Sequence, residues 1–206
     1  MSEINVQSLS KRFGYQWIIK DFGAKYHSGK VYGIAGNNGS GKSTLVRMLS
    51  GFLTPTTGSI NYQIHSKDVS VDQIYKHISL VGPYTDLIQE YSLEEMFNFH
   101  QKFKIFFNKL TFQEFEEKIN LTGQRHKTIH HLSSGMKQKV QLALALMSDT
   151  PIILLDEPTS FLDQKNKDWF IALLHENIRD RIVIIASNDA DDLSLCKEIM
   201  NLSQRN

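Results

Sequence analysis

The residues with the clearest chemical potential are 36–44, which read G-N-N-G-S-G-K-S-T and directly follow an apolar run at residues 31–35. Glycines at these spacings let successive backbone N–H groups turn toward phosphate oxygens, and a helix that begins at Lys42 would point the positive end of its dipole at the same anion. Lys42 is predicted to reach the β- and γ-phosphates, and Ser43 to ligate Mg²⁺. The segment predicts a site for ATP or GTP; the alternative is a glycine-rich turn that only joins a strand to a helix. The residues expected to form this phosphate loop are Gly36, Asn37, Asn38, Gly39, Ser40, Gly41, Lys42, Ser43 and Thr44.

A second chemical signal lies at residues 152–157, which read I-I-L-L-D-E. An apolar strand that ends in two carboxylates supplies what phosphoryl transfer to water needs, one acid for the Mg²⁺ shell and one base for the water. We therefore assign Asp156 to the metal and Glu157 to the general base. Two acids paired with lysines at a strand end would be a purely structural alternative, which the phosphate loop in the same chain disfavours.

Strands and helices must alternate to bring these two segments together. Apolar runs rich in Ile or Val predict buried strands at residues 31–35, 78–81, 152–155 and 182–186. Helical spacing predicts helices at residues 42–50, 137–148 and 166–177. Because strands alternate with helices, we expect an α/β fold whose core sheet is largely parallel.

Two further regions differ from this alternation. Shorter strands around a turn at residues 54–58 predict an antiparallel lobe near the N-terminus, at residues 4–9, 18–22 and 59–64. Residues 84–131 carry many phenylalanines at mixed helical spacings and no strand signal, so we expect an inserted helical lobe. Most of these rings should form a small local core, and a few exposed ones would be enough to dock a partner helix.

Size and composition limit the function classes. The 206 residues fit one α/β domain, 1–206, and the formal net charge of +1 gives no electrostatic footprint for nucleic acid or an anionic membrane. The single cysteine, Cys196, excludes an internal disulfide and suits a reducing compartment. No apolar stretch approaches the roughly 20 residues that span a bilayer. We expect a cytoplasmic chain that reaches a membrane only through another polypeptide.

Residues 132–139 decide between families of phosphate-loop proteins. Their sequence L-S-S-G-M-K-Q-K resembles the L-S-G-G-Q signature of ATP-binding-cassette (ABC) ATPases, although Ser/Gly clusters before helices are also ordinary N-caps. An apolar helix and the D-E-P-T-S segment at 156–160 follow in that family's order, and S-F-L-D at 160–163 resembles its D-loop. The resemblance covers essentially the whole chain. It implies a P-loop NTPase fold with a RecA-like, mostly parallel sheet, an N-terminal antiparallel β lobe and an inserted α-helical lobe.

The resemblance also implies an assembly. It predicts the ATP-binding and ATP-hydrolysing subunit of an ABC transporter whose membrane permease is a separate chain, with ATP and Mg²⁺ as ligands and attachment to the inner face of the membrane through that permease. Two ATPase subunits, identical or different, would close head to tail, and each ATP would lie between the phosphate loop of one copy and the signature of the other. The further nucleotide contacts that it implies are Phe13, stacked on adenine, and Ser133, Ser134, Gly135 and Asp163. Tyr15 and Trp17 are nearby alternatives to Phe13 for the adenine stack.

The family pattern breaks at two positions. Pro83 stands where the family usually has a glutamine that touches Mg²⁺ and the attacking water, and we do not expect Gln89 to replace it. Asn188 stands where the switch histidine normally lies; its amide can donate to the γ-phosphate but cannot become cationic. Loss of such a donor costs roughly 10²–10³ in rate in comparable sites. We therefore predict slow hydrolysis by Glu157, Lys42 and Asn188.

A different class of function competes with this one. An ATP-gated dimer with little hydrolysis could regulate a partner complex, and the residues at 83 and 188 favour it. DNA-repair and chromosome-organising ATPases share the signature, but residues 45–131 contain no heptad repeat for their long coiled coil. We set nucleic-acid partners aside on that ground.

Overall fold

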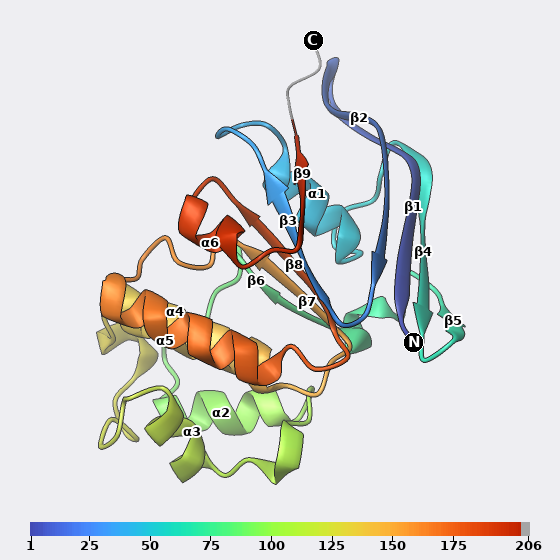
Figure 1. Ribbon diagram of the computed structural model, residues 1–206. Helices are drawn as coiled ribbons and strands as arrows, with labels where there is room; N and C mark the ends of the chain where they lie inside the picture. Colours follow the sequence, from blue (N-terminus) through green and yellow to red (C-terminus); the bar gives the residue numbers. More distant parts are fainter. Residues whose placement is uncertain (203–206) are drawn as a thin grey trace.

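A parallel five-stranded sheet forms the centre of the molecule. The computed structural model describes residues 1–202, so residues 203–206 of the predicted 1–206 domain lie outside the described part. The sheet has the order β6-β7-β8-β3-β9, and each of its neighbouring pairs is parallel. The strands are β6 (Ile78–Val81), β7 (Ile152–Asp156), β8 (Ile182–Ser187), β3 (Lys30–Ala35) and β9 (Glu198–Asn201). Crossing helices separate them along the chain, which confirms the predicted α/β alternation (Figure 1).

Both faces of this sheet are buried, because apolar side chains point alternately to either side. In β7, Ile153 and Leu155 join the core cluster that contains α4 and α5, whereas Ile152 and Leu154 join the cluster that contains α1. The covering helices are α1 (Lys42–Leu49), α4 (Ser134–Met147) and α5 (Gln164–Asn177). Helix α4 begins three residues before the predicted residue 137, because the Ser133 side chain caps it.

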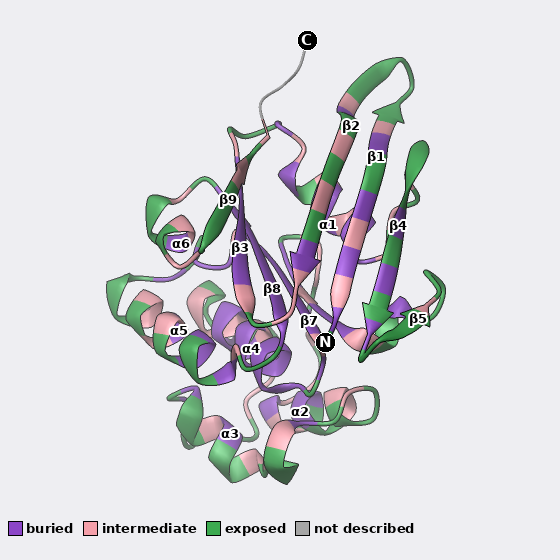
Figure 2. Ribbon diagram, turned by 45° about the vertical axis from the view of Figure 1, so that its right-hand side comes forward, coloured by how far each residue is buried: buried purple, intermediate pink, exposed green. Residues whose placement is uncertain are grey.

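A four-stranded antiparallel sheet, in the order β2-β1-β4-β5, covers the other side of α1. Its strands are β1 (Glu3–Phe13), β2 (Gln16–His27), β4 (Thr57–Ile64) and β5 (Lys67–Val69). Alternate residues of β4 are buried, as the purple and green bands in Figure 2 show, and the Tyr62 hydroxyl donates to the Leu49 carbonyl of α1 at 3.0 Å. β1 and β2 extend beyond the predicted 4–9 and 18–22, because most of their outer residues are exposed or half-buried and interrupt the apolar alternation, although Tyr26 is buried.

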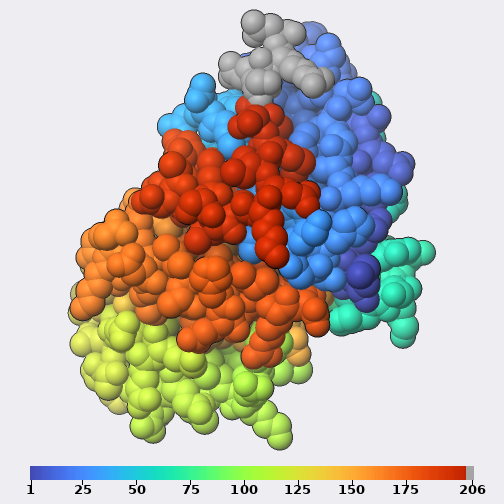
Figure 3. Space-filling model, viewed as in Figure 1, coloured from blue at the N-terminus to red at the C-terminus, as the bar shows by residue number. Residues whose placement is uncertain are grey.

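The inserted lobe lies at the end of the molecule away from the antiparallel sheet (Figure 3). It contains α2 (Leu93–Gln101) and α3 (Phe112–Lys118), and each begins with a capping box, formed by Ser92 with Glu95 and by Thr111 with Glu114. Short 3-10 turns lie at Ile74–His77, Phe107–Lys109 and Ile129–His131, and the short helix α6 spans Ala190–Ser194.

Most phenylalanines of the lobe form a local core, as predicted. Phe97 stacks on Phe106 at a centroid distance of 4.8 Å and packs against Phe115 at 5.0 Å, and all three rings are buried. Phe103 and Ile105 are more than two-thirds exposed, at 71% and 73%. Among the described residues, no helix is long and apolar enough to cross a membrane.

The far ends of α4 and α5 converge on one buried guanidinium. Arg181 is 4% exposed, and its N–H groups donate to the carbonyls of Leu146, Asn177, Ser148 and Thr150 at 2.7–3.0 Å. The carbonyls at helix C-termini have no partner within the helix, so one side chain satisfies several of them. Burial lowers the pKa of Arg181 to about 10, which leaves it charged at neutral pH.

We expect Arg181→Ala to lower the free energy of unfolding by roughly 2–4 kcal/mol, because it leaves several buried carbonyls without donors. Chemical denaturation followed by circular dichroism measures the change. Arg179→Ala is the matched control: Arg179 is exposed and stacks on Phe107, so its loss should cost less than about 1 kcal/mol. Equal effects of the two substitutions would contradict the capping role of Arg181.

Candidate nucleotide-binding site

The phosphate loop joins the end of β3 to the start of α1 at the carboxyl edge of the parallel sheet (Figure 1). Gly41 is the N-cap of α1 with φ of 99°, and Gly39 has φ of 82°, a region that favours glycine. A Cβ on Gly36 would lie 2.5 Å from the Ser40 hydroxyl oxygen. The backbone therefore curls tightly, and the start of α1 faces the space that the loop encloses.

Lys42 fills the centre of this loop. Its side chain is 6% exposed, and Nζ donates to the carbonyls of Gly36 at 2.8 Å and Asn37 at 3.4 Å. Nζ also lies 3.3 Å from Glu157 Oε1. Thus the predicted phosphate-binding cation and the predicted general base lie within ion-pair distance, although 115 positions separate them along the chain (157 − 42).

Asp156, at the end of β7, is 1% exposed, and neither carboxylate oxygen has a hydrogen-bond partner of regular geometry among residues 1–202. The hydroxyls of Ser43 and Tyr84 lie near enough to lower its pKa, but burial outweighs them and raises it. A buried carboxylate without a partner is costly unless a cation or proton neutralises it.

These residues fit Mg²⁺. Within the described part of the chain, no group of three or more His, Cys, Asp or Glu side chains could hold a metal alone. Mg²⁺ does not need one, since it usually takes one or two carboxylates together with substrate phosphates and water. The Asp156 oxygens and the neighbouring Ser43 hydroxyl are hard oxygen ligands of that kind.

Glu157 directly follows β7 with a left-handed φ of 50°. Its N–H donates to the Ala186 carbonyl at 2.8 Å, which fixes this strained backbone against β8. The Ser187 hydroxyl lies 3.0 Å from Glu157 Oε2. One carboxylate oxygen therefore faces Lys42 and the other faces the end of β8.

The two departures from the family pattern lie at the same edge. Asn188 Nδ2 donates to Asn38 Oδ1 of the phosphate loop at 3.1 Å. Pro83 is exposed, and Gln89 is held elsewhere, by Lys137 Nζ at 2.8 Å and the Leu87 carbonyl at 2.8 Å. Gln89 is therefore bonded to α4 and to its own segment, although it lines the same cleft as Asp156.

The remaining predicted residues lie apart from the phosphate loop. Ser133 and Ser134 are exposed at the start of α4, where Ser133 Oγ accepts from the Met136 N–H at 3.3 Å. Asp163 caps α5 by accepting from the Asn166 N–H at 2.9 Å. Phe13 is half exposed at the end of β1, with Lys11 Nζ 5.2 Å from its ring centroid.

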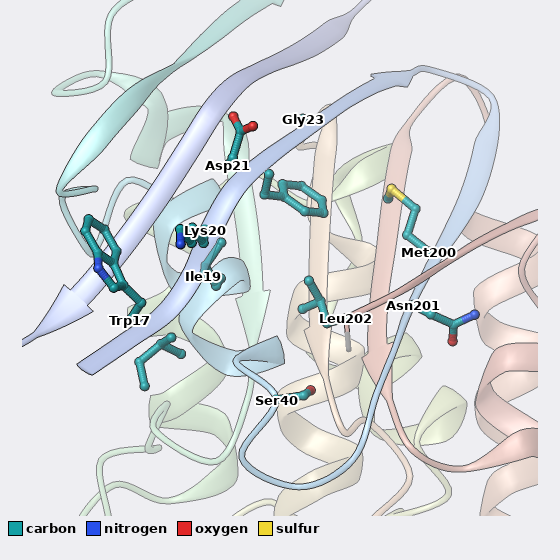
Figure 4. Close-up of a pocket in the computed structure, with 11 residues that line it drawn as sticks. Trp17, Ile19, Lys20, Asp21, Gly23, Ser40, Met200, Asn201 and Leu202 are labelled. Atoms are coloured by element: carbon teal, nitrogen blue, oxygen red, sulfur yellow. The ribbon is translucent and has the colours of Figure 1, made fainter. Parts of the chain in front are cut away.

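Two hollows adjoin the site. A cleft of about 230 Å³ extends from Asp156 and Glu157 past Pro83 to Ser134, and so joins the strand ends to the start of α4. A larger hollow of about 380 Å³ lies between β2 and β9, and Ser40 of the phosphate loop lines one part of it (Figure 4). Both carboxylates of the Asp-Glu pair, Asp156 and Glu157, line the smaller cleft.

Sequence reasoning missed three polar residues near Asp156 and Glu157, namely Tyr84, Ser187 and Asp192. The Tyr84 ring lies against Gly82 and Asp156, since a Cβ on Gly82 would be 3.0 Å from Tyr84 Cζ and 3.1 Å from Asp156 Cβ. Ser187 and Asp192 are buried beside Glu157. Ser187 immediately precedes Asn188, so its position offered a signal, whereas the approach of Tyr84 and Asp192 depends on the fold.

A glycine-rich loop with a buried lysine, followed by a helix and faced by an Asp-Glu pair on a neighbouring parallel strand, defines a P-loop nucleotide-binding protein. The family model described as ABC transporter matches residues 19–160. The uncharacterized ABC transporter ATP-binding protein YybJ of Bacillus subtilis (strain 168) is 31% identical over 198 residues, which are 94% of this chain and 89% of YybJ. The chain therefore belongs to the ABC transporter family, as an ATP-binding domain of the ABC ATPase type.

A second sequence relative and a solved structure support the assignment to this family. The methionine import ATP-binding protein MetN of Chlamydia caviae is 32% identical over 177 residues, and the match covers 80% of this chain but 51% of MetN. The chain thus spans about half the length of that relative. The solved dimeric structure of MJ0796, a bacterial ABC transporter cassette, has the same fold, with a TM-score of 0.79 at 23% identity over 96% of this chain and 93% of that one.

We expect Gly41→Ala to weaken ATP binding and destabilise the protein, because its Cβ would lie 2.9 Å from Ile18 Cγ2 on β2. The left-handed backbone costs roughly 1–2 kcal/mol, and the overpacking adds about 1–3 kcal/mol. Gly123→Ala is the control, since Gly123 also has positive φ but open space around it. Titration with a fluorescent ATP analogue and thermal unfolding measure both effects; equal losses in the two variants would contradict the close packing of the loop on β2.

Proposed function

We propose that this chain hydrolyses ATP as one subunit of an ABC transporter whose membrane permease is a separate chain, and that residues 1–206 form a single ATPase domain. The observation that carries the proposal is the 3.3 Å approach of Glu157 Oε1 to Lys42 Nζ at the phosphate loop. It brings a carboxylate base next to the cation that would hold the terminal phosphates. A protein that only bound nucleotide would not need that base.

The residues of the proposed site would contact different parts of the nucleotide and its metal ion. The backbone N–H groups of residues 36–44 would cradle the β- and γ-phosphates, and Lys42 would exchange its bonds to loop carbonyls for phosphate oxygens. Asp156 and Ser43 would hold Mg²⁺, which supplies charge neutralisation to the phosphates when bound. Phe13 would stack on adenine from the end of β1.

Glu157 would accept a proton from the attacking water, a step that contributes about 10²–10⁴-fold in comparable enzymes. Its left-handed backbone, bonded to Ala186, keeps the carboxylate at the edge of the sheet. Asn188, bonded to Asn38, would donate to the γ-phosphate in place of a cationic group. Because the glutamine position is Pro83 and the switch position is Asn188, hydrolysis should be slow.

The active assembly should be a head-to-tail dimer with a second ABC ATPase subunit, identical or different. Ser133 and Ser134 are exposed and Gly135 is half-buried at a helix start that follows the inserted lobe in the chain. An exposed helix N-terminus can add donors to a γ-phosphate held by another copy, with Asp163 nearby. ATP would then hold the dimer closed, and its hydrolysis would release it.

The permease would attach the chain to the inner face of a membrane, while the chain itself remains cytoplasmic. The side chains of Phe103 and Ile105 offer an exposed apolar surface on the inserted lobe, and this supports docking of a permease helix there. The bonds of Lys137 to Gln89 and of Gln141 to Thr85 would link α4 to the residues that follow β6, where that lobe begins.

Two substitutions favour a second function, an ATP-gated binding module with little hydrolysis. Proline at 83 has no side-chain polar group, and asparagine at 188 cannot shuttle a proton. If both losses are decisive, the dimer would open by ATP release and act as a regulator of its partner complex.

We expect slow Mg²⁺-dependent ATP hydrolysis that Glu157→Gln abolishes and Asn188→His raises, because the first removes the base and the second restores a cationic donor. Phosphate release measured on the purified chain tests both. No turnover above that of Glu157→Gln, despite ATP binding, would instead support the regulatory function. A native rate typical of intact ABC ATPases, with no gain from Asn188→His, would contradict the expected slow hydrolysis.

We expect ATP to convert Glu157→Gln to a dimer, and Ser134→Glu in that background to remain monomeric while it binds ATP. A carboxylate in the first turn of α4 suits the helix dipole, so the fold should persist, but it would repel the γ-phosphate held by the other copy. Light scattering after size-exclusion chromatography measures the mass. A full dimer with Ser134→Glu would contradict the proposed role of the signature helix.

A further inference from the structure

The hydroxyl of Ser187 lies between two carboxyl groups at the end of β8. Ser187 Oγ is 3.0 Å from Glu157 Oε2 and 2.7 Å from Asp192 Oδ2. The same oxygen accepts the Asp189 N–H at 3.0 Å. Ser187 is fully buried and Asp192 is 2% exposed.

A count of donors and acceptors shows that this arrangement needs an additional proton. A serine hydroxyl has one proton, whereas an ionised carboxylate can only accept. If both carboxyl groups were ionised, Ser187 could donate to one of them and would present a lone pair to the other at hydrogen-bonding distance. Both contacts can be regular two-centre hydrogen bonds only if one carboxyl group carries a proton and donates to Ser187.

Burial indicates which carboxyl group holds that proton. Glu157 is partly exposed, with 22% of its side chain accessible, and it lies beside the Lys42 ammonium. Asp192 is buried, and its Oδ1 has no hydrogen-bond partner of regular geometry among residues 1–202, although the Thr159 hydroxyl is nearby. A buried carboxyl group without a cation is far less costly when it is neutral.

We propose that Asp192 is a positioning residue whose protonated carboxyl group donates to Ser187, so that the Ser187 hydroxyl donates to Glu157 Oε2. The direction of the two bonds is then fixed along the series Asp192, Ser187, Glu157. Glu157 Oε2 is held by Ser187, and Oε1 remains directed toward Lys42 and the phosphate loop. The protonation of Asp192 stands on the geometry alone, whereas its effect on catalysis rests on the proposed ATPase function.

Among the described residues, no cation forms an ion pair with the carboxylate of Asp192. Lys167 of α5 lies near enough to act on Asp192 electrostatically, but it pairs with Asp189 at 2.6 Å and with Asp191 at 3.4 Å. Asp189 adds negative charge to the surroundings, as does Glu157 beyond Ser187. The Cys196 thiol donates to the Asp192 backbone carbonyl at 3.7 Å.

The first experiment tests the protonation without any need for turnover. Burial raises the pKa of Asp192 above its ordinary value of 3.8. A raised pKa in the folded state makes the protein lose stability as pH rises through that pKa. Asn is neutral at every pH and can donate to Ser187, so Asp192→Asn should match the native melting temperature near pH 4 and exceed it increasingly toward pH 8.

Asp189→Asn is the matched control, three residues away. The hydrogen bond from Lys167 lowers the pKa of Asp189, so its stabilising effect is present above the ordinary pKa and is lost as pH falls. Asp189→Asn should therefore melt below the native protein at pH 7 and approach it at low pH. If Asp192→Asn also lost stability with rising pH relative to the native protein, Asp192 would be ionised and the proposal overturned.

The second experiment tests positioning. Asp192→Asn should keep more ATP turnover than Asp192→Ala, and Ser187→Thr more than Ser187→Ala, because the conservative variants retain the donors. The loss should appear in kcat, by about tenfold, and not in KM, because these residues do not face the phosphates. Equal kcat in Asp192→Asn and Asp192→Ala would overturn the positioning role. If the native chain does not exceed Glu157→Gln, the proposed ATPase fails, and the melting series still decides the protonation.

Discussion

The in-register pairing of three parallel strands is the constraint on which the site depends. β7 and β8 pair so that Asp156 is level with Ala186, and β3 and β8 pair so that Ala35 is level with Ser187. Parallel strands end at the same edge of the sheet, so the phosphate loop, the Asp-Glu pair and the end of β8 must meet there. A slip of one residue in β7 would turn Asp156 to the opposite face. Buried apolar residues on both faces prevent such a slip.

The same burial means that charged side chains at the site must be paired or neutralised. Lys42, Asp156 and Asp192 are each nearly inaccessible to water, and a buried charge is tolerated only when it is paired or neutralised. The charge of each side chain is compensated in a different way. Lys42 is bonded to loop carbonyls and to Glu157, the Asp156 oxygens are suited to a cation, and Asp192 is suited to a proton. Three similar degrees of burial thus support three different chemical roles.

Helix α1 and the inserted lobe are connected to the parallel sheet in different ways. α1 lies between the two sheets and packs against both, and the phosphate loop lies at its start. The inserted lobe contacts the parallel sheet through α4, and side-chain bonds such as that of Gln89 to Lys137 tie the residues after β6 to the same helix. A displacement of the lobe would therefore be transmitted to the cleft beside Glu157.

The sequence by itself determined the α/β alternation, the phosphate loop and the pair Asp156 and Glu157, because apolar periodicity and short motifs are local properties of the chain. It also identified Pro83 and Asn188 as departures. Only the tertiary structure brought Arg181 to the helix ends, Tyr84 to Asp156, and Asp192 to Ser187. Those contacts depend on how strands and helices that are distant in the sequence pack together, and the burial that shifts the pKa of Asp192 exists only after they do.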